Sequence, residues 1–133
     1  MENDQVPSFV EKLKGKHVLV VEDNLALADI LLRLMRHYGI RATHAKDGNE
    51  AIKQIEKEGP DIILLDIGLP DMNGLEIARF VRQNESTKSV VIVAMSGFDA
   101  RESSLQNGCN AFLHKPFRLP DLLAKIAKCL EQG

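Results

Sequence analysis

Polar and charged side chains stand directly at the ends of short apolar runs in this sequence. The set consists of the acidic pair Glu22-Asp23, then Asp66, Ser96 and the dipeptide Lys115-Pro116. If the apolar runs are strands of one parallel sheet, these residues line a single rim, because open α/β sheets bind ligands beyond the carboxyl ends of their strands. A single residue of this kind would be explained as a solvated loop residue, but random placement explains the whole set poorly. The sequence therefore predicts one site built from three carboxylates, a hydroxyl and a lysine.

The chemistry of such a site follows from its charges. Clustered carboxylates repel one another, and a hard divalent cation offsets the repulsion; Mg²⁺ suits carboxylate, carbonyl and water ligands. A phosphoryl group fits beside the metal, since Mg²⁺ and an ammonium neutralise its oxygens while a hydroxyl donates a hydrogen bond. One carboxylate would then act as the nucleophile, as in enzymes that form aspartyl phosphates.

The elements that must position these residues alternate between two kinds. Three runs are rich in Val, Ile and Leu without polar alternation, as in central parallel strands, and two are weaker. In chain order the five runs are His17–Glu22, Ile40–Ala45, Asp61–Asp66, Val90–Met95 and Asn110–Leu113. Each is followed by a stretch of helical length: Asn24–Tyr38, Gly48–Glu58, Gly74–Gln83, Asp99–Asn107 and Leu119–Gln132. Five strand–helix units predict an α/β fold with a parallel sheet and helices on both faces.

Composition limits the remaining possibilities. The 133 residues suffice for one domain with its own core, and 44% are hydrophobic and 27% charged, as in globular proteins. A net charge of −2 gives no basic footprint, so direct binding to nucleic acid is not expected. No apolar run could span a bilayer and no signal peptide opens the chain, so we expect a cytoplasmic protein without membrane insertion. Cys109 and Cys129 are expected to be reduced, structural thiols.

The polar N-terminal segment differs from the rest of the chain. We expect residues 1–15 to be a linker or short helix, with helix beginning near Ser8; the alternative is the end of a helix from an upstream domain. The main domain is expected to span residues 16–133.

Four strings make the sequence similar to a known family. They are VLVVEDN around Glu22-Asp23, IILLDIGLPDMNGLE around Asp66, VAMSG around Ser96 and AFLHKPF around Lys115-Pro116. In this order they resemble the receiver domains of two-component response regulators, over roughly residues 16–131. The resemblance implies a flavodoxin-like (βα)5 fold, a doubly wound parallel five-stranded sheet in the order 2-1-3-4-5, which the family is known to have.

The resemblance also implies roles for individual residues. Asp66 would be the phosphoacceptor, attacking the phosphohistidine of a histidine kinase or histidine phosphotransfer protein. Mg²⁺ would be bound by Asp23, Asp66 and the carbonyl of Gly68, with Glu22 acting mainly through water. Lys115 and Ser96 would hold phosphoryl oxygens, and Phe112 would occupy the aromatic switch position. The Lys115–Pro116 bond would be cis. The domain would not be an enzyme, although it would catalyse its own phosphorylation and dephosphorylation.

The first predicted helix supplies a candidate docking surface for the phosphodonor. Its sheet-facing side is expected to carry Leu27, Ile30, Leu31, Leu34, Met35 and Tyr38. Leu25 and Leu32, bordered by Ala28, would then face outward beside the acceptor. Because the receiver family presents this helix to its histidine-bearing partner, the resemblance implies that these three residues take part in partner docking.

Several alternatives stay open from the sequence. The chain could be a receiver-like scaffold that binds partners without phosphorylation. It could be a stand-alone regulator or the receiver of a hybrid histidine kinase, and its downstream partner is unknown. Gly68 and Phe98 flank the path of hydrolytic water, so they leave the phosphoryl lifetime open. A flavin carrier is disfavoured because Glu22-Asp23 would repel the flavin phosphate, and a phosphatase because Gly68 stands where that class has a second Asp.

Overall fold

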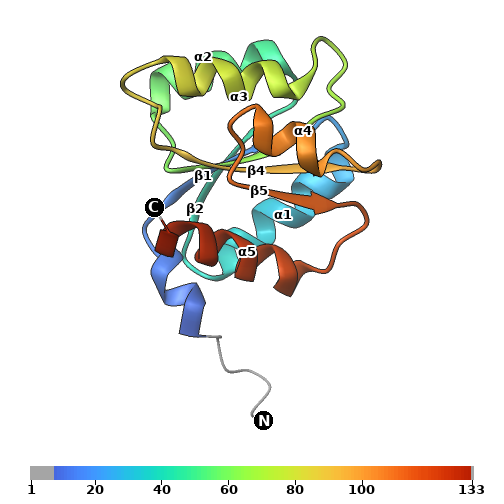
Figure 1. Ribbon diagram of the computed structural model, residues 1–133. Helices are drawn as coiled ribbons and strands as arrows, with labels where there is room; N and C mark the ends of the chain where they lie inside the picture. The colour runs from blue at the N-terminus through green and yellow to red at the C-terminus, as the bar shows by residue number, and fades with distance from the viewer. Residues whose placement is uncertain (1–7, 133) are drawn as a thin grey trace.

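The five predicted strands form one parallel sheet. A computed structural model describes residues 8–132 of the chain (Figure 1). The strands are β1 His17–Val21, β2 Arg41–Ala45, β3 Ile62–Asp66, β4 Val91–Ser96 and β5 Ala111–His114. They pair in the order β2-β1-β3-β4-β5, and every pairing is parallel. The predicted fold class and strand order are confirmed.

Helices cover both faces of the sheet, as expected of a doubly wound fold (Figure 1). They are α1 Leu25–His37, α2 Gly48–Glu58, α3 Gly74–Gln83, α4 Arg101–Gln106 and α5 Leu119–Gln132. Helices α1 and α5 pack on one face of the sheet, and α2, α3 and α4 lie on the other, so the core has two layers. Every residue of β1, β3 and β4 is buried, which explains why these strands are continuously apolar. Cys129 and Cys109 are free thiols, one in each layer.

Polar caps begin three of the helices immediately after the loops that leave the sheet. The side chain of Asn24 accepts a hydrogen bond from the amide of Leu27, Asp47 accepts from Glu50, and Asn73 accepts from Leu75. Each cap satisfies an amide that the first turn of a helix leaves unpaired, and so it fixes where the helix starts. Within residues 8–132, no helix has the length and apolar character needed to cross a lipid bilayer.

A short 3-10 helix, η2 (Ser8–Leu13), precedes the first strand and packs beside the C-terminal helix α5 (Figure 1). Val10 and Leu13 are fully buried in the same core layer as α5, and Lys12 pairs with Glu131. Residues 1–7 of the expected N-terminal segment, and Gly133, lie outside the described residues. The packed core thus includes residues that precede position 16, where the sequence analysis begins the main domain.

Candidate functional site

The three predicted carboxylates meet at the carboxyl end of the sheet. β1 and β3 are neighbours, with Val21 in register with Leu65, so the residues that follow them lie side by side. Carboxylate oxygens of Glu22, Asp23 and Asp66 all lie within 4.8 Å of one another. Glu22 and Asp66 are buried and Asp23 is exposed, so the cluster is open to solvent on one side. The sequence prediction that these three residues converge is confirmed.

Lys115 supplies the positive charge beside the carboxylates. Its Nζ lies 2.7 Å from Glu22 Oε1 and 3.6 Å from Asp66 Oδ1, across a sequence separation of more than forty residues from either partner. The Lys115–Pro116 peptide bond is cis, as the family resemblance implies. A buried carboxylate without a cationic partner would be costly, and the ammonium compensates Glu22.

Asp66 is the carboxylate whose protonation is most perturbed. Burial, and then the negative charge of Glu22, raise its pKa from 3.8 to about 6. Lys115 and the amide of Gly68, which donates to Asp66 Oδ1 at 3.2 Å, act in the opposite direction without cancelling the effect. The folded protein thus holds a carboxylate whose negative charge is poorly compensated, and an added cation would relieve it.

The loop after β3 is held close to Asp66 by a glycine. A Cβ atom on Gly74 would lie 2.5 Å from the carbonyl oxygen of Asp66 and 2.8 Å from Cα of Ile67, so no larger residue fits there without a shift. Gly68 also forms an isolated bridge with Asn73, which closes the loop. A Cβ at Gly68 would meet nothing within 4 Å apart from Gly68 and its two chain neighbours, so the space beside it is open.

Two residues that support the site were missed by the sequence analysis. Asp71 accepts hydrogen bonds from the amides of Gly48 and Asn49, at 2.8 and 3.0 Å, and so ties the loop after β3 to the start of α2. The half-buried His44 places its Nε2 2.7 Å from the backbone carbonyl of Glu22. No pattern in the sequence indicates either contact, because each joins segments that only the sheet brings together.

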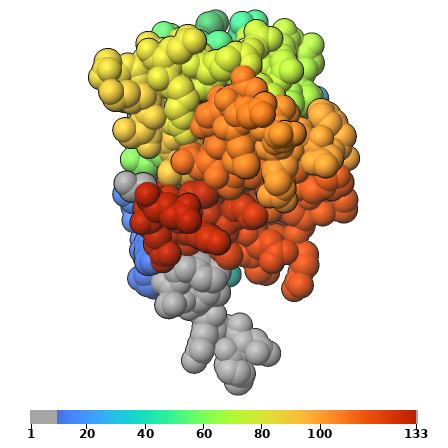
Figure 2. Space-filling view, in the orientation of Figure 1, coloured from blue at the N-terminus to red at the C-terminus, as the bar shows by residue number. Residues whose placement is uncertain are grey.

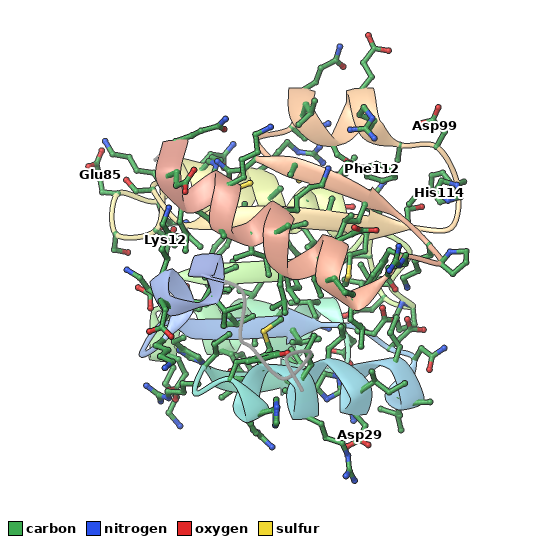
Figure 3. All side chains as sticks on the ribbon, turned by 90° about the horizontal axis from the view of Figure 1, so that it is seen from below. Lys12, Asp29, Glu85, Asp99, Phe112 and His114 are labelled. Carbon is green, nitrogen blue, oxygen red and sulfur yellow. The ribbon has the colours of Figure 1, made fainter. Side chains whose placement is uncertain are left out.

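Ser96 and Phe112 lie on β4 and β5, where the sequence analysis placed them. Ser96 is buried; its Oγ accepts from the amide of Phe98 at 3.1 Å, and its carbonyl accepts from the amide of Lys115 at 2.7 Å. Phe112 is buried, and the guanidinium of Arg101 lies 5.7 Å from its ring centroid. Figure 3 shows Asp99, in the loop after β4, and His114, at the end of β5, at the same end of the sheet. The hydroxyl of Ser96 is therefore held at the rim, and the ring of Phe112 points inward.

The predicted docking surface on α1 needs correction. Ala28 is only 2% exposed, and Leu32 is half-buried against the core, so only Leu25, at 66% exposed, lies on the surface as expected. Ile30, expected to face the sheet, is 48% exposed. The helix is rotated from the expected position, because Ala28, Leu31 and Met35 form its buried stripe.

The exposed side of α1 instead borders an apolar hollow. This hollow has a volume of about 600 Å³ and is lined by Asn24, Leu27, Ile30, Lys115, Pro116, Phe117 and Leu119. It joins the surface of α1 to the loop that carries Lys115, so a partner seated in it would reach the carboxylate cluster.

This arrangement can do specific chemistry. Three oxygen donors on one open rim suit a hard cation, and the residues present fit one because the buried Asp66 carboxylate lacks full compensation. The ammonium of Lys115 stands beside the same rim, where it can pair with an anionic group.

Comparisons with known proteins agree with the geometry. The family model described as "Response regulator receiver domain" matches residues 18–127. The transcriptional regulatory protein TrcR of Mycobacterium tuberculosis is 36% identical over 117 residues, which are 87% of this chain and 46% of that protein. The chain thus spans about half the length of the first curated relatives it matches.

Relatives of similar length are also found. The polar-differentiation response regulator DivK of Brucella ovis is 30% identical over 118 residues, 86% of this chain and 96% of that protein. The crystal structure of a CheY-like response regulator receiver domain protein from Methanospirillum hungatei superposes with a TM-score of 0.82 at 29% identity, covering 88% of this chain and 94% of that one. Fold, site and comparisons lead to one conclusion: the chain belongs to the response regulator receiver domains of two-component systems, a family whose standard function is phosphorelay signalling.

Proposed function

We propose that this chain receives a phosphoryl group on Asp66 from the phosphohistidine of a histidine kinase or histidine phosphotransfer protein. The observation that carries the proposal is the geometry of the rim. Three carboxylates lie within 4.8 Å of one another, and the ammonium of Lys115 stands 3.6 Å from Asp66. An oxygen of Asp66 attacks phosphorus, the P–N bond breaks, and the electron pair leaves with the imidazole nitrogen.

Each residue of the rim has a part in this transfer. Asp23, Asp66 and the carbonyl of Gly68 would hold Mg²⁺ directly, with Glu22 acting through water. When bound, Mg²⁺ supplies positive charge that neutralises phosphoryl oxygens. Lys115 pairs with one of those oxygens, and Ser96 donates its hydroxyl to another. The same groups would assist attack of water on the aspartyl phosphate, so the domain would catalyse its own phosphorylation and dephosphorylation without being an enzyme that acts on other molecules.

The phosphorylated state is proposed to act through Ser96 and Phe112. Movement of Ser96 toward the phosphoryl group would free space beneath the rim, and the ring of Phe112, already buried, would shift further into that space. The surface formed by α4, β5 and α5 would then change its affinity for a downstream partner. A coupling of about 1–3 kcal/mol is sufficient, because it changes affinity roughly 5–150-fold.

The phosphodonor is proposed to dock on the apolar hollow beside α1. Leu27, Ile30 and Phe117 offer an apolar surface next to Lys115, which places a bound histidine domain near Asp66. This assignment replaces the surface of Leu25, Ala28 and Leu32. Donors of this kind are themselves protein domains that act in the cytoplasm, which is where the proposal places the chain.

Intact-mass measurement tests the acceptor. The wild type, treated with acetyl phosphate and Mg²⁺, should gain one phosphoryl group that Asp66→Asn lacks. Asp99→Asn, which removes an exposed carboxylate from a nearby loop, is the matched control and should be modified like the wild type. Equal modification of Asp66→Asn and the wild type would refute the assignment and favour a scaffold that binds partners without phosphorylation.

A further inference from the structure

The side chain of His44 takes the place of a ladder hydrogen bond at the point where β1 leaves the sheet. In the pairing of β1 with β2, the amide of Glu22 donates to the carbonyl of Ala45. The regular alternation of a parallel ladder would make the amide of Asp47 the next donor, to the carbonyl of Glu22. Strand β2 ends at Ala45, however, and Asp47 caps α2. The imidazole of His44 fills this position, with its Nε2 2.7 Å from the Glu22 carbonyl oxygen.

His44 is itself held firmly enough to fix this contact. A backbone carbonyl oxygen only accepts hydrogen bonds, so Nε2 of His44 must carry the hydrogen and donate it. The carbonyl of His44 accepts in turn from Nε2 of Gln54 on α2, at 2.7 Å, and the residue is in register with Val20 of β1. The half-buried ring therefore extends from a strand that is tied on both sides, and side chains on rigid elements place their partners precisely.

The carbonyl that His44 holds belongs to the peptide unit between Glu22 and Asp23. A peptide unit is planar, so fixing its oxygen also fixes the amide and the Cα of Asp23. The side chain of Glu22 is held by other groups: Nζ of Lys115 lies 2.7 Å from Oε1, and the amide of Asn24 donates to Oε2 at 3.1 Å. Asp23 is exposed, so its carboxylate is placed mainly by its backbone. The direction of the Asp23 side chain thus depends on the bond from His44.

His44 acts from the edge of the sheet opposite to the proposed switch. Strand β2 forms one edge of the sheet, and β5, which carries Phe112, forms the other. Helices α4 and α5, which contact β5, lie at the front of the molecule in Figure 2 (orange and red). A substitution of His44 can therefore change the acidic pair without directly altering the surface of those two helices.

We infer that His44 is a positioning residue for phosphoryl acceptance. It holds the peptide between Glu22 and Asp23 so that the carboxylate of Asp23 stays beside that of Asp66, within the 4.8 Å that brings the cluster together. The inference rests on the proposed function, in which Asp23 and Asp66 hold one Mg²⁺ ion. Groups that orient metal ligands typically change metal affinity by about 10–100-fold, and we expect the lower value because Glu22 keeps its other contacts.

Titration of the full chain with Mg²⁺, followed by NMR of the backbone amides and without a phosphodonor, tests the inference. His44→Leu removes the donor and should raise the Kd for Mg²⁺ about tenfold. His44→Gln keeps an amide N–H at the reach of Nε2 and should restore a Kd close to that of the wild type. His44→Asn has an amide too short to reach the carbonyl, so it should bind as weakly as His44→Leu. A wild-type Kd in both His44→Leu and His44→Asn, or no rescue by His44→Gln, would overturn the inference.

His17→Leu is the matched control, because it separates positioning from a general loss of stability. His17 is buried at the opposite end of β1, and its Nε2 lies 2.8 Å from Oγ1 of Thr43 on β2, so it joins the same two strands. His17→Leu should lower the free energy of unfolding, measured in urea, and leave the Kd for Mg²⁺ unchanged where the protein is folded. Equal weakening of Mg²⁺ binding by His17→Leu and His44→Leu would show that the effect is one of stability, and the inference would be wrong.

Hydrogen exchange of the Mg²⁺-free protein reports the position of the acidic pair directly. The amide of Asn24 donates to Oε2 of Glu22, so its exchange depends on how firmly this turn is held. It should exchange faster in His44→Leu than in the wild type, and at the wild-type rate in His44→Gln. Unchanged exchange in His44→Leu would contradict the positioning role.

Intact-mass analysis with acetyl phosphate keeps this inference distinct from the proposed function. His44→Leu should be phosphorylated slowly at low Mg²⁺ and at close to the wild-type rate when Mg²⁺ is saturating. Phosphorylation of Asp66 together with Mg²⁺ binding that does not depend on His44 would refute the inference alone. Mg²⁺ binding that depends on His44, in a wild type that is not phosphorylated on Asp66, would support the inference and refute the proposed function. A wild type that binds no Mg²⁺ would refute both.

Discussion

The ammonium of Lys115 lies 2.7 Å from the carboxylate of Glu22 but 3.6 Å from that of Asp66. The positive charge of the site is therefore used mainly to balance the fully buried Glu22, and Asp66 keeps a less compensated negative charge. This is the arrangement expected of a nucleophile, since a carboxylate held tightly by an ammonium is less available to attack phosphorus. The poorly compensated charge of Asp66 also destabilises the folded protein, so removing that charge should raise the stability of the fold.

Asp66→Asn should raise the Tm of the Mg²⁺-free protein at about pH 8. The folded protein raises the pKa of Asp66 from 3.8 to about 6. The folded state therefore binds the proton more tightly than the unfolded state does, and this stabilising contribution is complete below about pH 4 and lost as the pH rises through about 6. Thermal melts should show a gain from Asp66→Asn at about pH 8 that becomes small at about pH 5.

Asp99→Asn is the control for this series, because its carboxylate is exposed and its removal should shift Tm little at either pH. Added Mg²⁺ should raise the Tm of the wild type and leave that of Asp66→Asn nearly unchanged. A destabilised Asp66→Asn at about pH 8 would show that Lys115 and Gly68 compensate the charge fully.

Gly74→Ala should displace the backbone at Asp66 and so disturb the site. Its Cβ would lie 2.5 Å from the backbone carbonyl oxygen of Asp66, so either the loop or the end of β3 must move. We expect a loss of about 1–3 kcal/mol in the free energy of unfolding, typical of overpacking, together with slower phosphorylation by acetyl phosphate. Urea denaturation and intact-mass time courses measure the two effects.

Gly97→Ala is the matched control for Gly74→Ala. Apart from Gly97 itself and its two chain neighbours, nothing lies within 4 Å of the position its Cβ would take, so the free energy of unfolding of Gly97→Ala should stay close to that of the wild type. Equal stabilities of Gly74→Ala and Gly97→Ala would mean that the loop relaxes without cost.

Arg82→Met should destabilise the fold without removing the acceptor chemistry. Its guanidinium donates four hydrogen bonds, to the carbonyls of Gly108, Lys88 and Val90 and to the side chain of Asn110, at 2.6–2.9 Å. These bonds join α3 to the start of β4 and to the turn between α4 and β5. Losing them removes the donor from the carbonyls of Gly108 and Val90, whose bonds to Arg82 are part-buried, so we expect a loss of about 3 kcal/mol in urea denaturation.

Arg79→Met on the same helix provides the comparison. Arg79 is exposed and bonds to the side chain of Asn107, so its loss should cost less than about 0.5 kcal/mol. Both variants, measured where they are folded, should still accept a phosphoryl group on Asp66. Similar stabilities of the two variants would show that water replaces the bonds of Arg82.

Ile30→Asp should slow phosphoryl transfer from a phosphorylated histidine phosphotransfer protein by about tenfold, the effect of losing an interface side chain worth more than 1 kcal/mol. Ile30 is 48% exposed and lines the hollow beside Lys115. Phosphorylation by acetyl phosphate should stay at the wild-type rate. Leu25→Asp, a change of the same type outside that hollow, should have the smaller effect, and the opposite ranking would restore Leu25 as the docking residue.

The sequence by itself determined which residues form the site. Buried parallel strands must be apolar on both faces, so β1, β3 and β4 are recognisable as unbroken Val, Ile and Leu runs, and the polar residues that end them must share one edge of the sheet. The same rule places Glu22, Asp23, Asp66, Ser96 and Lys115 at one edge from the sequence. Strand order and the cis bond before Pro116 followed from the family resemblance rather than from the residues themselves.

Tertiary structure alone decided which face of each helix is buried and which long-range contacts surround the site. Helix α1 has Leu or Ile at so many positions that periodicity could not identify its buried stripe, and only packing against the sheet placed Ala28 in the interior and left Ile30 exposed. The contact of His44 with the Glu22 carbonyl and the approach of Gly74 to Asp66 join segments distant in sequence. Hydrogen bonds and steric contacts act over only a few ångströms, so such neighbours are fixed only when the whole sheet has formed.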